Sequence, residues 1–128
     1  MEGIRVKYRM VKGEEKMPLI HVNWNVKASD REKKELMDFI TDTVSEVTNT
    51  DRSRIYVFIC HYEKEDVSNP DCPVVQIDWV DLPERTLEAK KEITERIIKR
   101  LSEWPEIMQE RILVLFSDVP RHNARIGG

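Results

Sequence analysis

The chain contains two copies of one sequence unit, and this internal repeat constrains its fold more than any other feature. Three segments of the first copy return in the same order in the second: Pro18-Leu-Ile-His-Val-Asn-Trp24 as Pro73-Val-Val-Gln-Ile-Asp-Trp79, Lys33-Lys-Glu-Leu36 as Lys90-Lys-Glu-Ile93, and Arg54-Ile-Tyr-Val-Phe-Ile59 as Arg111-Ile-Leu-Val-Leu-Phe116. The numbering offset is 55 for the first pair and 57 for the other two. The second copy therefore carries a two-residue insertion near Asp81-Leu-Pro83.

Each copy is predicted to form a strand, a helix and a second strand. Residues 19–24 and 74–80 are short β-rich segments preceded by proline, which is tolerated at the start of a strand. Residues 55–60 and 112–117 are nearly continuous apolar runs, typical of strands that are covered on both faces or buried at a subunit contact.

Capping signals and apolar spacing predict the two helices. Ser29 followed by Glu32 is a capping box, and a second helix is expected to begin near Thr86 and to stop before Pro105. Apolar residues at helical spacing define one face of each helix. These residues are Leu36, Ile40, Val44 and Val47 in the first helix and Ala89, Ile93, Ile97 and Leu101 in the second.

These elements predict an α+β fold. A strand–helix–strand crossover within one sheet is parallel, so tandem β-α-β repeats would form a four-stranded sheet with two helices on one face. The other face would carry large apolar groups, and we predict that oligomerisation covers it.

Residues 1–17 lie outside the repeat. Ile4, Val6, Tyr8 and Met10 alternate with charged residues, a period that predicts an extra half-exposed strand, and residues 12–16 indicate a turn. We therefore expect an N-terminal extension, residues 1–17, and a domain, residues 18–128, made of repeats 18–72 and 73–128.

Composition excludes several classes of protein. The 128 residues carry 21 Lys and Arg against 24 Asp and Glu, a net charge of −3 that disfavours nucleic acid as a partner. No apolar run approaches the ~20 residues of a membrane span. The only cysteines, Cys60 and Cys72, are far apart and predict a reducing, cytoplasmic location without a zinc site.

The start and end of the repeated region resemble the tautomerase superfamily. The residues concerned are Met17-Pro18-Leu-Ile-His-Val22, the helix start Ser29-Asp30 and the closing Ile126-Gly-Gly128. The doubled unit is similar to the two-repeat branches: cis-3-chloroacrylic acid dehalogenase, malonate semialdehyde decarboxylase and macrophage migration inhibitory factor. This resemblance implies a homotrimer and catalysis by an amino-terminal proline, with no cofactor.

Pro18 is the residue to which the resemblance assigns catalysis. A free prolyl nitrogen is a secondary amine that can serve as a base near neutral pH when a low-dielectric pocket or a cation lowers its pKa. Here 17 residues precede Pro18, so its nitrogen is an amide without a basic lone pair. Two explanations stay open: Pro18 becomes the N-terminus, or the protein is a divergent member without the usual catalyst.

Other family positions are only partly matched. The family's paired carboxylate-binding arginines fall on Asp81-Leu-Pro-Glu-Arg85, where only Arg85 matches. Arg85 could bind a substrate carboxylate through two hydrogen bonds or could be a solvated loop residue. Family arginine positions also fall at Ala28, beside Lys27, and at Tyr56, while the acid of the dehalogenases falls near Ile126. Dehalogenation and malonate semialdehyde decarboxylation are therefore disfavoured.

Further candidates follow the closing strand of each repeat. Arg121, His122 and Arg125 could bind an anionic carboxylate ligand or make subunit contacts. His61 and Tyr62 could supply a general acid, although a loop histidine is more often simply exposed. His21, Trp24 and Trp79 are interpreted as packing residues, with the two tryptophans in equivalent repeat positions.

Three functional hypotheses remain. The first is a tautomerase, an isomerase that moves a proton on a small 2-oxo or enol carboxylic acid, with Pro18 as base and Arg85 as carboxylate ligand. The second is a catalytically divergent, oligomeric protein of the same fold that binds a ligand or protein. The third is a ferredoxin-like binding module, which ranks last because residues 55–60 and 112–117 lack the basic, glycine-containing motif of RNA-binding versions.

Overall fold

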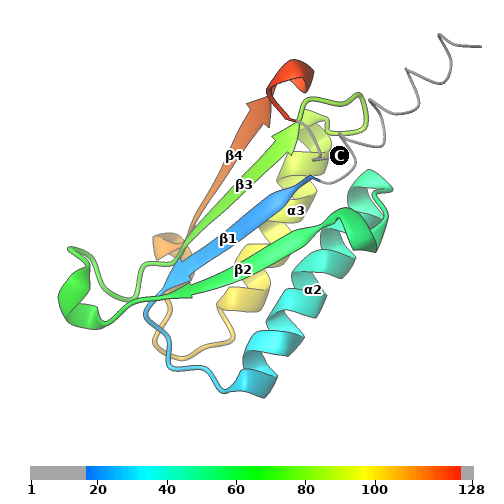
Figure 1. Cartoon of the computed structure of the whole chain (residues 1–128). Coiled ribbons are helices and arrows are strands. Elements are labelled where there is room, and N and C mark those ends of the chain that lie inside the picture. The colour runs from blue at the N-terminus through cyan, green and yellow to red at the C-terminus, as the bar shows by residue number, and fades with distance from the viewer. Residues whose placement is uncertain (1–16, 125–128) are drawn as a thin grey trace, which may run out of the picture.

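The computed structural model describes residues 17–124 of the chain, and these form one sheet with two helices against it (Figure 1). The predicted fold class is confirmed for this part of the chain. The strand predicted for residues 4–10 lies outside the described residues. The helices and strands are β1 (Leu19–Trp24), α2 (Asp30–Thr48), β2 (Tyr56–His61), β3 (Val74–Val80), α3 (Leu87–Leu101) and β4 (Leu113–Val119).

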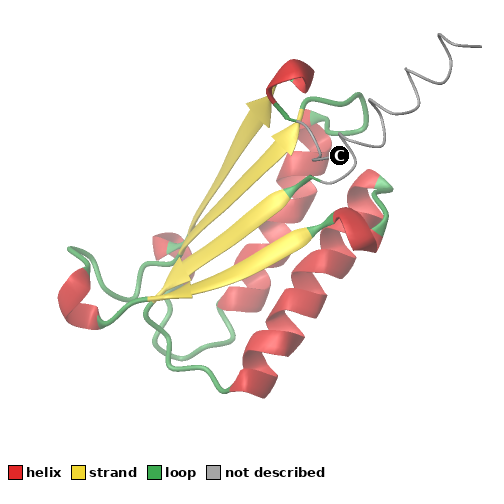
Figure 2. Ribbon diagram, viewed as in Figure 1, coloured by secondary structure: helices red, strands yellow, loops and turns green. Residues whose placement is uncertain are grey.

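The sheet has the strand order β2-β1-β3-β4. Each repeat supplies a parallel pair, β1 with β2 and β3 with β4, whereas β1 and β3 run antiparallel at the centre. The two repeats are thus related by an approximate two-fold arrangement, with the closing strand of each at an outer edge. Both helices cover the same face of the sheet (Figure 2).

Both predicted N-terminal helix caps are present in the structure. Ser29 Oγ accepts a hydrogen bond from the Glu32 backbone N–H at 3.1 Å, and Glu32 Oε1 accepts one from the Ser29 N–H at 2.9 Å, which completes the capping box. Thr86 caps α3 by accepting from the Ala89 N–H at 3.1 Å. Side chains therefore satisfy backbone donors at the start of both helices.

The core lies between the helices and the alternate strand residues that face them. Of the predicted apolar helix faces, every residue is buried except Val47, which is partly buried. The strand residues completing the centre of this core are Ile20, Val22, Trp24, Val75, Ile77 and Trp79. The regular alternation along β1 and β3 is what gives the sheet one buried apolar face.

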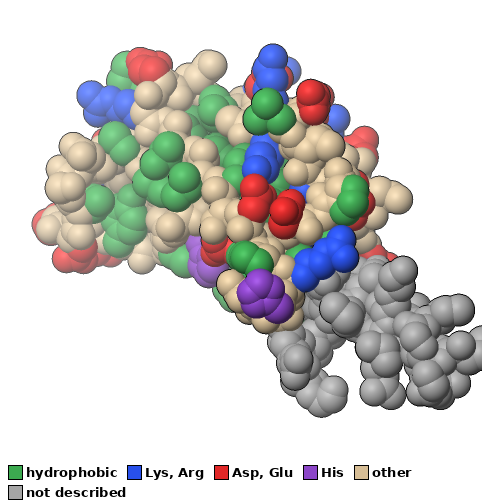
Figure 3. Space-filling model, turned by 90° about the horizontal axis from the view of Figure 1, so that it is seen from above, with side chains coloured by type: hydrophobic (Ala, Val, Ile, Leu, Met, Phe, Trp, Pro, Cys, Tyr) green, Lys and Arg blue, Asp and Glu red, His purple; other side chains and the backbone are tan. Residues whose placement is uncertain are grey.

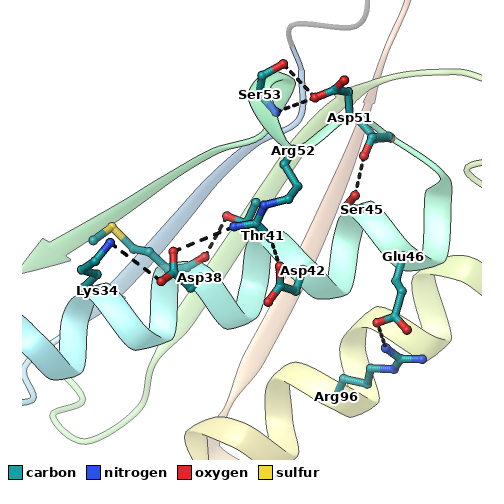
Figure 4. Close-up of polar contacts among 12 residues, drawn as sticks. Lys34, Asp38, Thr41, Asp42, Ser45, Glu46, Asp51, Arg52, Ser53 and Arg96 are labelled. Atoms are coloured by element: carbon teal, nitrogen blue, oxygen red, sulfur yellow. Dashed lines mark hydrogen bonds and ion pairs between the residues drawn. The ribbon is translucent and has the colours of Figure 1, made fainter.

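Charged contacts hold the helix α2 against the turn that follows it. Arg52, in the 3-10 turn Arg52–Arg54, forms ion pairs with Asp42 and Asp38 on the exposed side of α2 (Figure 4). Arg96 of α3 pairs with Glu46 of α2 at 3.1 Å, also drawn in Figure 4. These exposed pairs contribute little stability individually.

The closing strands differ from their prediction. Both start one residue later than expected, and in the single chain both are edge strands covered on one face. Coverage on both faces within the chain is therefore wrong, and burial at a subunit contact stays a prediction. The other face of these strands exposes large apolar side chains: Tyr56 (39%), Phe58 (45%), Leu113 (52%) and Leu115 (50%). Each run is therefore apolar on both faces of its strand. One face packs against the helices, and the other is exposed in the single chain.

Candidate functional site

Antiparallel pairing brings four of the candidate residues, Pro18, Arg85, Arg121 and His122, to one end of the sheet. Because Leu19 lies opposite Asp78, the start of β1 meets the ends of β3 and β4. Pro18, Arg85 and the turn Arg121–Asn123 therefore lie at this end, the upper end in Figure 1. Seen from above, it carries basic, acidic and histidine side chains close to hydrophobic ones (Figure 3).

Pro18 is buried immediately before β1. Its carbonyl oxygen accepts a hydrogen bond from the Tyr56 backbone N–H at 3.0 Å, which joins the start of β1 to that of β2. Its nitrogen is bonded to the Met17 carbonyl carbon, so in this chain it is an amide and not a base.

Arg85 is 5% exposed and is therefore not a solvated loop residue. Its Nη1 donates a hydrogen bond to the Val80 carbonyl oxygen, and its Nη2 donates one to the Met17 carbonyl oxygen at 3.1 Å. The guanidinium carbon lies 5.3 Å from the centre of the Trp79 ring. Since the Met17 carbonyl is bonded to the Pro18 nitrogen, the positive charge of Arg85 lies beside that nitrogen.

Asp118, Trp79 and Lys90 form a hydrogen-bonded cluster next to Arg85, here called the Asp118 cluster. The sequence analysis did not predict it. Asp118 accepts two hydrogen bonds of 2.7 Å, one from Trp79 Nε1 and one from Lys90 Nζ. The hydrogen bond from Lys90 is the main cause that lowers the pKa of Asp118, with smaller contributions from Trp79 and the charge of Arg85. The Asp118 carboxyl group is thus ionised at neutral pH and satisfies a buried indole N–H.

The remaining candidates are more scattered. Arg121 and His122 are exposed on the turn after β4, and Arg125 lies outside the described residues.

His61 and Tyr62 lie at the opposite end of the sheet, where burial raises the pKa of Tyr62. His21 stacks on Phe58 with ring centres 4.8 Å apart, on the open face. The packing interpretation of His21 fits this contact.

Within residues 17–124, no group of three or more His, Cys, Asp and Glu side chains could hold a metal ion, and both cysteines are free thiols. None of the helices in that range is long and apolar enough to span a membrane.

Comparison with known proteins finds a family model that matches part of the chain. Residues 18–68 match the family model described as tautomerase enzyme. A search of curated proteins found no significant match. The match covers less than half of the chain, and the solved structures below are similar to the chain in fold.

Similar solved structures share this fold. Native fused 4-OT has a TM-score of 0.68 and 18% identity, with 86% of this chain and 93% of that chain covered. FG41 malonate semialdehyde decarboxylase inhibited by 3-bromopropiolate has a TM-score of 0.64 and 18% identity, covering 86% and 89%. Macrophage migration inhibitory factor of Toxoplasma gondii has a TM-score of 0.69 and 13% identity, covering 85% and 96%.

The Asp118 cluster generates a prediction about stability. Replacing Asp118 with Asn removes the charge that binds Lys90, so we expect the free energy of unfolding at pH 7 to fall by about 1 kcal/mol. Because folding lowers the pKa of Asp118, its stabilisation is complete above the ordinary Asp pKa of about 4 and is lost as the pH falls through the lower folded value. Urea unfolding of both proteins at pH 7 and near pH 2 measures this difference.

The control for this prediction is Glu46→Gln, which removes an exposed ion pair and should cost less than about 0.5 kcal/mol. An Asp118→Asn protein that is as stable as the wild type at pH 7, or that stays equally less stable near pH 2, would contradict the assignment.

Proposed function

We propose that a form of this protein beginning at Pro18 is a cofactor-independent tautomerase. It would move a proton between carbon and oxygen of a small 2-oxo or enol carboxylic acid. The observation that carries the proposal is the hydrogen bond from Arg85 Nη2 to the Met17 carbonyl, which holds a buried cation beside the prolyl nitrogen. The family match beginning at residue 18 also supports it.

The chemistry follows from replacing an amide by a free amine. An uncharged Pro18 amine can remove a proton from the carbon next to a substrate carbonyl and return it to the oxygen or carbon of the resulting enolate. Burial and the charge of Arg85 both disfavour the protonated amine, so both lower its pKa toward neutrality.

Arg85 would have a second role once Met17 is absent. The N–H that now binds the Met17 carbonyl could instead bind a carboxylate or enolate oxygen of the substrate. Arg121, His122 and Arg125 are proposed to bind the anionic substrate from the segment that follows β4.

The alternative function is that of a catalytically divergent, ligand- or protein-binding oligomer. The chain with Met17 attached favours it, because the Pro18 nitrogen is an amide and Arg85 donates to two backbone carbonyls. The two functions differ in one testable property, the requirement for a free amine at Pro18.

The test compares the full chain with a form that begins at Pro18. We expect the form beginning at Pro18 to ketonise an enolpyruvate-type acid, measured by loss of enol absorbance, at least about 100-fold faster than the full chain. Within the shortened form, Pro18→Ala should lose a similar factor, because it replaces the secondary amine. Equal activity of the full chain and the shortened form, or of the shortened form and its Pro18→Ala variant, would exclude Pro18 as the base.

We also propose that the protein is a homotrimer assembled through the open face of the sheet. The exposed apolar residues of β2 and β4 support this, and fused 4-OT of the same fold forms symmetric and asymmetric trimers.

Sedimentation tests the trimer. We expect a mass about three times 15.2 kDa, and expect Leu115→Glu to lower it because a charge cannot be buried unpaired at the contact. Leu87→Glu is the matched control, since Leu87 is 78% exposed but lies on α3, on the other side of the sheet. A wild-type mass near 15.2 kDa at micromolar concentration would contradict the proposal.

A further inference from the structure

Two residues of opposite charge contact the buried side chain of Trp79. Asp118 Oδ1 accepts a hydrogen bond of 2.7 Å from Trp79 Nε1. The guanidinium carbon of Arg85 lies over the ring, 5.3 Å from its centre. Because Trp79 is fully buried, its ring forms a fixed connection between Asp118 on β4 and Arg85 in the loop before α3.

The strand register extends this connection to the start of β1. Leu19 of β1 is paired with Asp78 of β3, and Trp79 of β3 is paired with Asp118 of β4. Pro18, Trp79 and Asp118 therefore follow one another across this end of the sheet, with Trp79 in the middle. The Arg85 guanidinium, which lies on the middle residue, donates to the carbonyl that is bonded to the Pro18 nitrogen.

The internal repeat shows that the two charged contacts of Trp79 occur together. Both copies keep the tryptophan at the end of their first strand and the lysine of their helix, but they differ at the two charged residues that contact the ring. The equivalent pairs, with the second copy first, are Trp79 and Trp24, Lys90 and Lys33, Arg85 and Ala28, and Asp118 and His61. The arginine and the aspartate are both present in the copy that lies against Pro18, and both are replaced in the other.

Asp118 favours one orientation of the Trp79 ring. A buried indole N–H that lacks an acceptor destabilises the conformation that contains it, so the ring is held with its N–H toward Asp118. Lys90 Nζ donates to the other carboxylate oxygen at 2.7 Å and so holds Asp118 in turn. The orientation of the ring is thus set by β4 and α3.

The Trp79 ring in turn limits where the Arg85 guanidinium can lie. An arginine side chain has many rotamers, and a cation–π contact restricts them to those that lie over the ring. Arg85 also donates to the carbonyls of Val80 and Met17. In a form that begins at Pro18 the Met17 carbonyl is absent, so the contact with the Trp79 ring would then contribute a larger share of the positioning.

We propose that Asp118 is a positioning residue for Arg85: by accepting the hydrogen bond of Trp79, it fixes the ring on which the guanidinium lies and holds that cation beside the nitrogen of residue 18. Its consequence for catalysis rests on the proposed tautomerase function, in which the Arg85 charge lowers the pKa of the Pro18 amine. The charge of Asp118 itself acts in the opposite sense, because an anion favours the protonated amine. Asp118 therefore supports a basic, uncharged amine through geometry and not through its charge.

The Met17 carbonyl carbon reports the position of Arg85 in the full chain, without a substrate. Met17 is the only methionine that is followed by proline, so carbonyl-¹³C methionine combined with ¹⁵N proline labels a single coupled pair of atoms. An Arg85→Met variant supplies the chemical shift of this carbonyl without its donor. We expect Asp118→Leu, which has nearly the shape of Asp but no acceptor, to move the shift at least half of the way to that value. Asp118→Ala, which also lacks an acceptor, should do the same.

Two variants that keep the acceptor are the matched controls. Asp118→Asn removes the charge but retains an oxygen, which should stay on the buried Trp79 N–H because Lys90 at the surface can be solvated instead. Lys90→Met leaves Asp118 bound to Trp79. We expect both variants to keep the wild-type Met17 carbonyl shift. Ser29→Ala removes the cap of α2 and lowers stability elsewhere, and it should also leave the shift unchanged.

Asp118→Leu and Asp118→Ala proteins that keep the wild-type shift would overturn the proposal, as would an Asp118→Asn or Ser29→Ala protein that moves it as far as Asp118→Leu does. An Arg85→Met protein with the wild-type shift would contradict both this proposal and the hydrogen bond on which the proposed function depends. Because no activity is measured, the positioning role can fail while the proposed function stands, and the reverse.

Discussion

The antiparallel pairing of β1 with β3 determines which residues meet at each end of this molecule. Within each repeat the two strands are parallel, so the helix crossover returns the chain to the end at which it began. Joining the repeats head to tail places the start of β1 beside the end of β3. Pro18 consequently meets residues from the loop after β3, although Arg85 lies 67 positions further along the sequence.

The two ends built by this pairing have diverged. At the Pro18 end, an aspartate of β4 links a tryptophan to a lysine, and Arg85 lies against the same tryptophan. At the other end, a histidine, His61, takes the position of the aspartate beside the corresponding tryptophan, Trp24. A duplicated unit has thus placed different side chains at its two equivalent strand ends, an aspartate in one repeat and a histidine in the other.

Much of the fold could be predicted because its signals are local. The capping box of Ser29 and Glu32, the cap at Thr86 and the bounds of β1 and β3 depend on residues a few positions apart. The repeat then supplied the order of the elements. The start of β2 and of β4 was wrong by one residue, because a continuous apolar run does not mark where strand pairing begins.

The site was less predictable because it depends on pairing between distant segments. Pro18 and Arg85 were identified only through the family resemblance, and the burial of Arg85 could not be read from its polar loop. Asp118 was missed entirely, since its partner Trp79 is 39 residues away and becomes its neighbour only in the parallel register of β3 and β4. The same register was needed to recognise His61 as its counterpart.

The pKa of the Pro18 amine, in a form that begins at that residue, tests the central claim most directly. A ¹⁵N-labelled proline titrated by NMR would report it without any assumption about the substrate. The account predicts a pKa well below that of an exposed N-terminal amine, and a rise of about one unit or more in an Arg85→Met variant that stays folded. An ordinary pKa that is unchanged by Arg85→Met would contradict it.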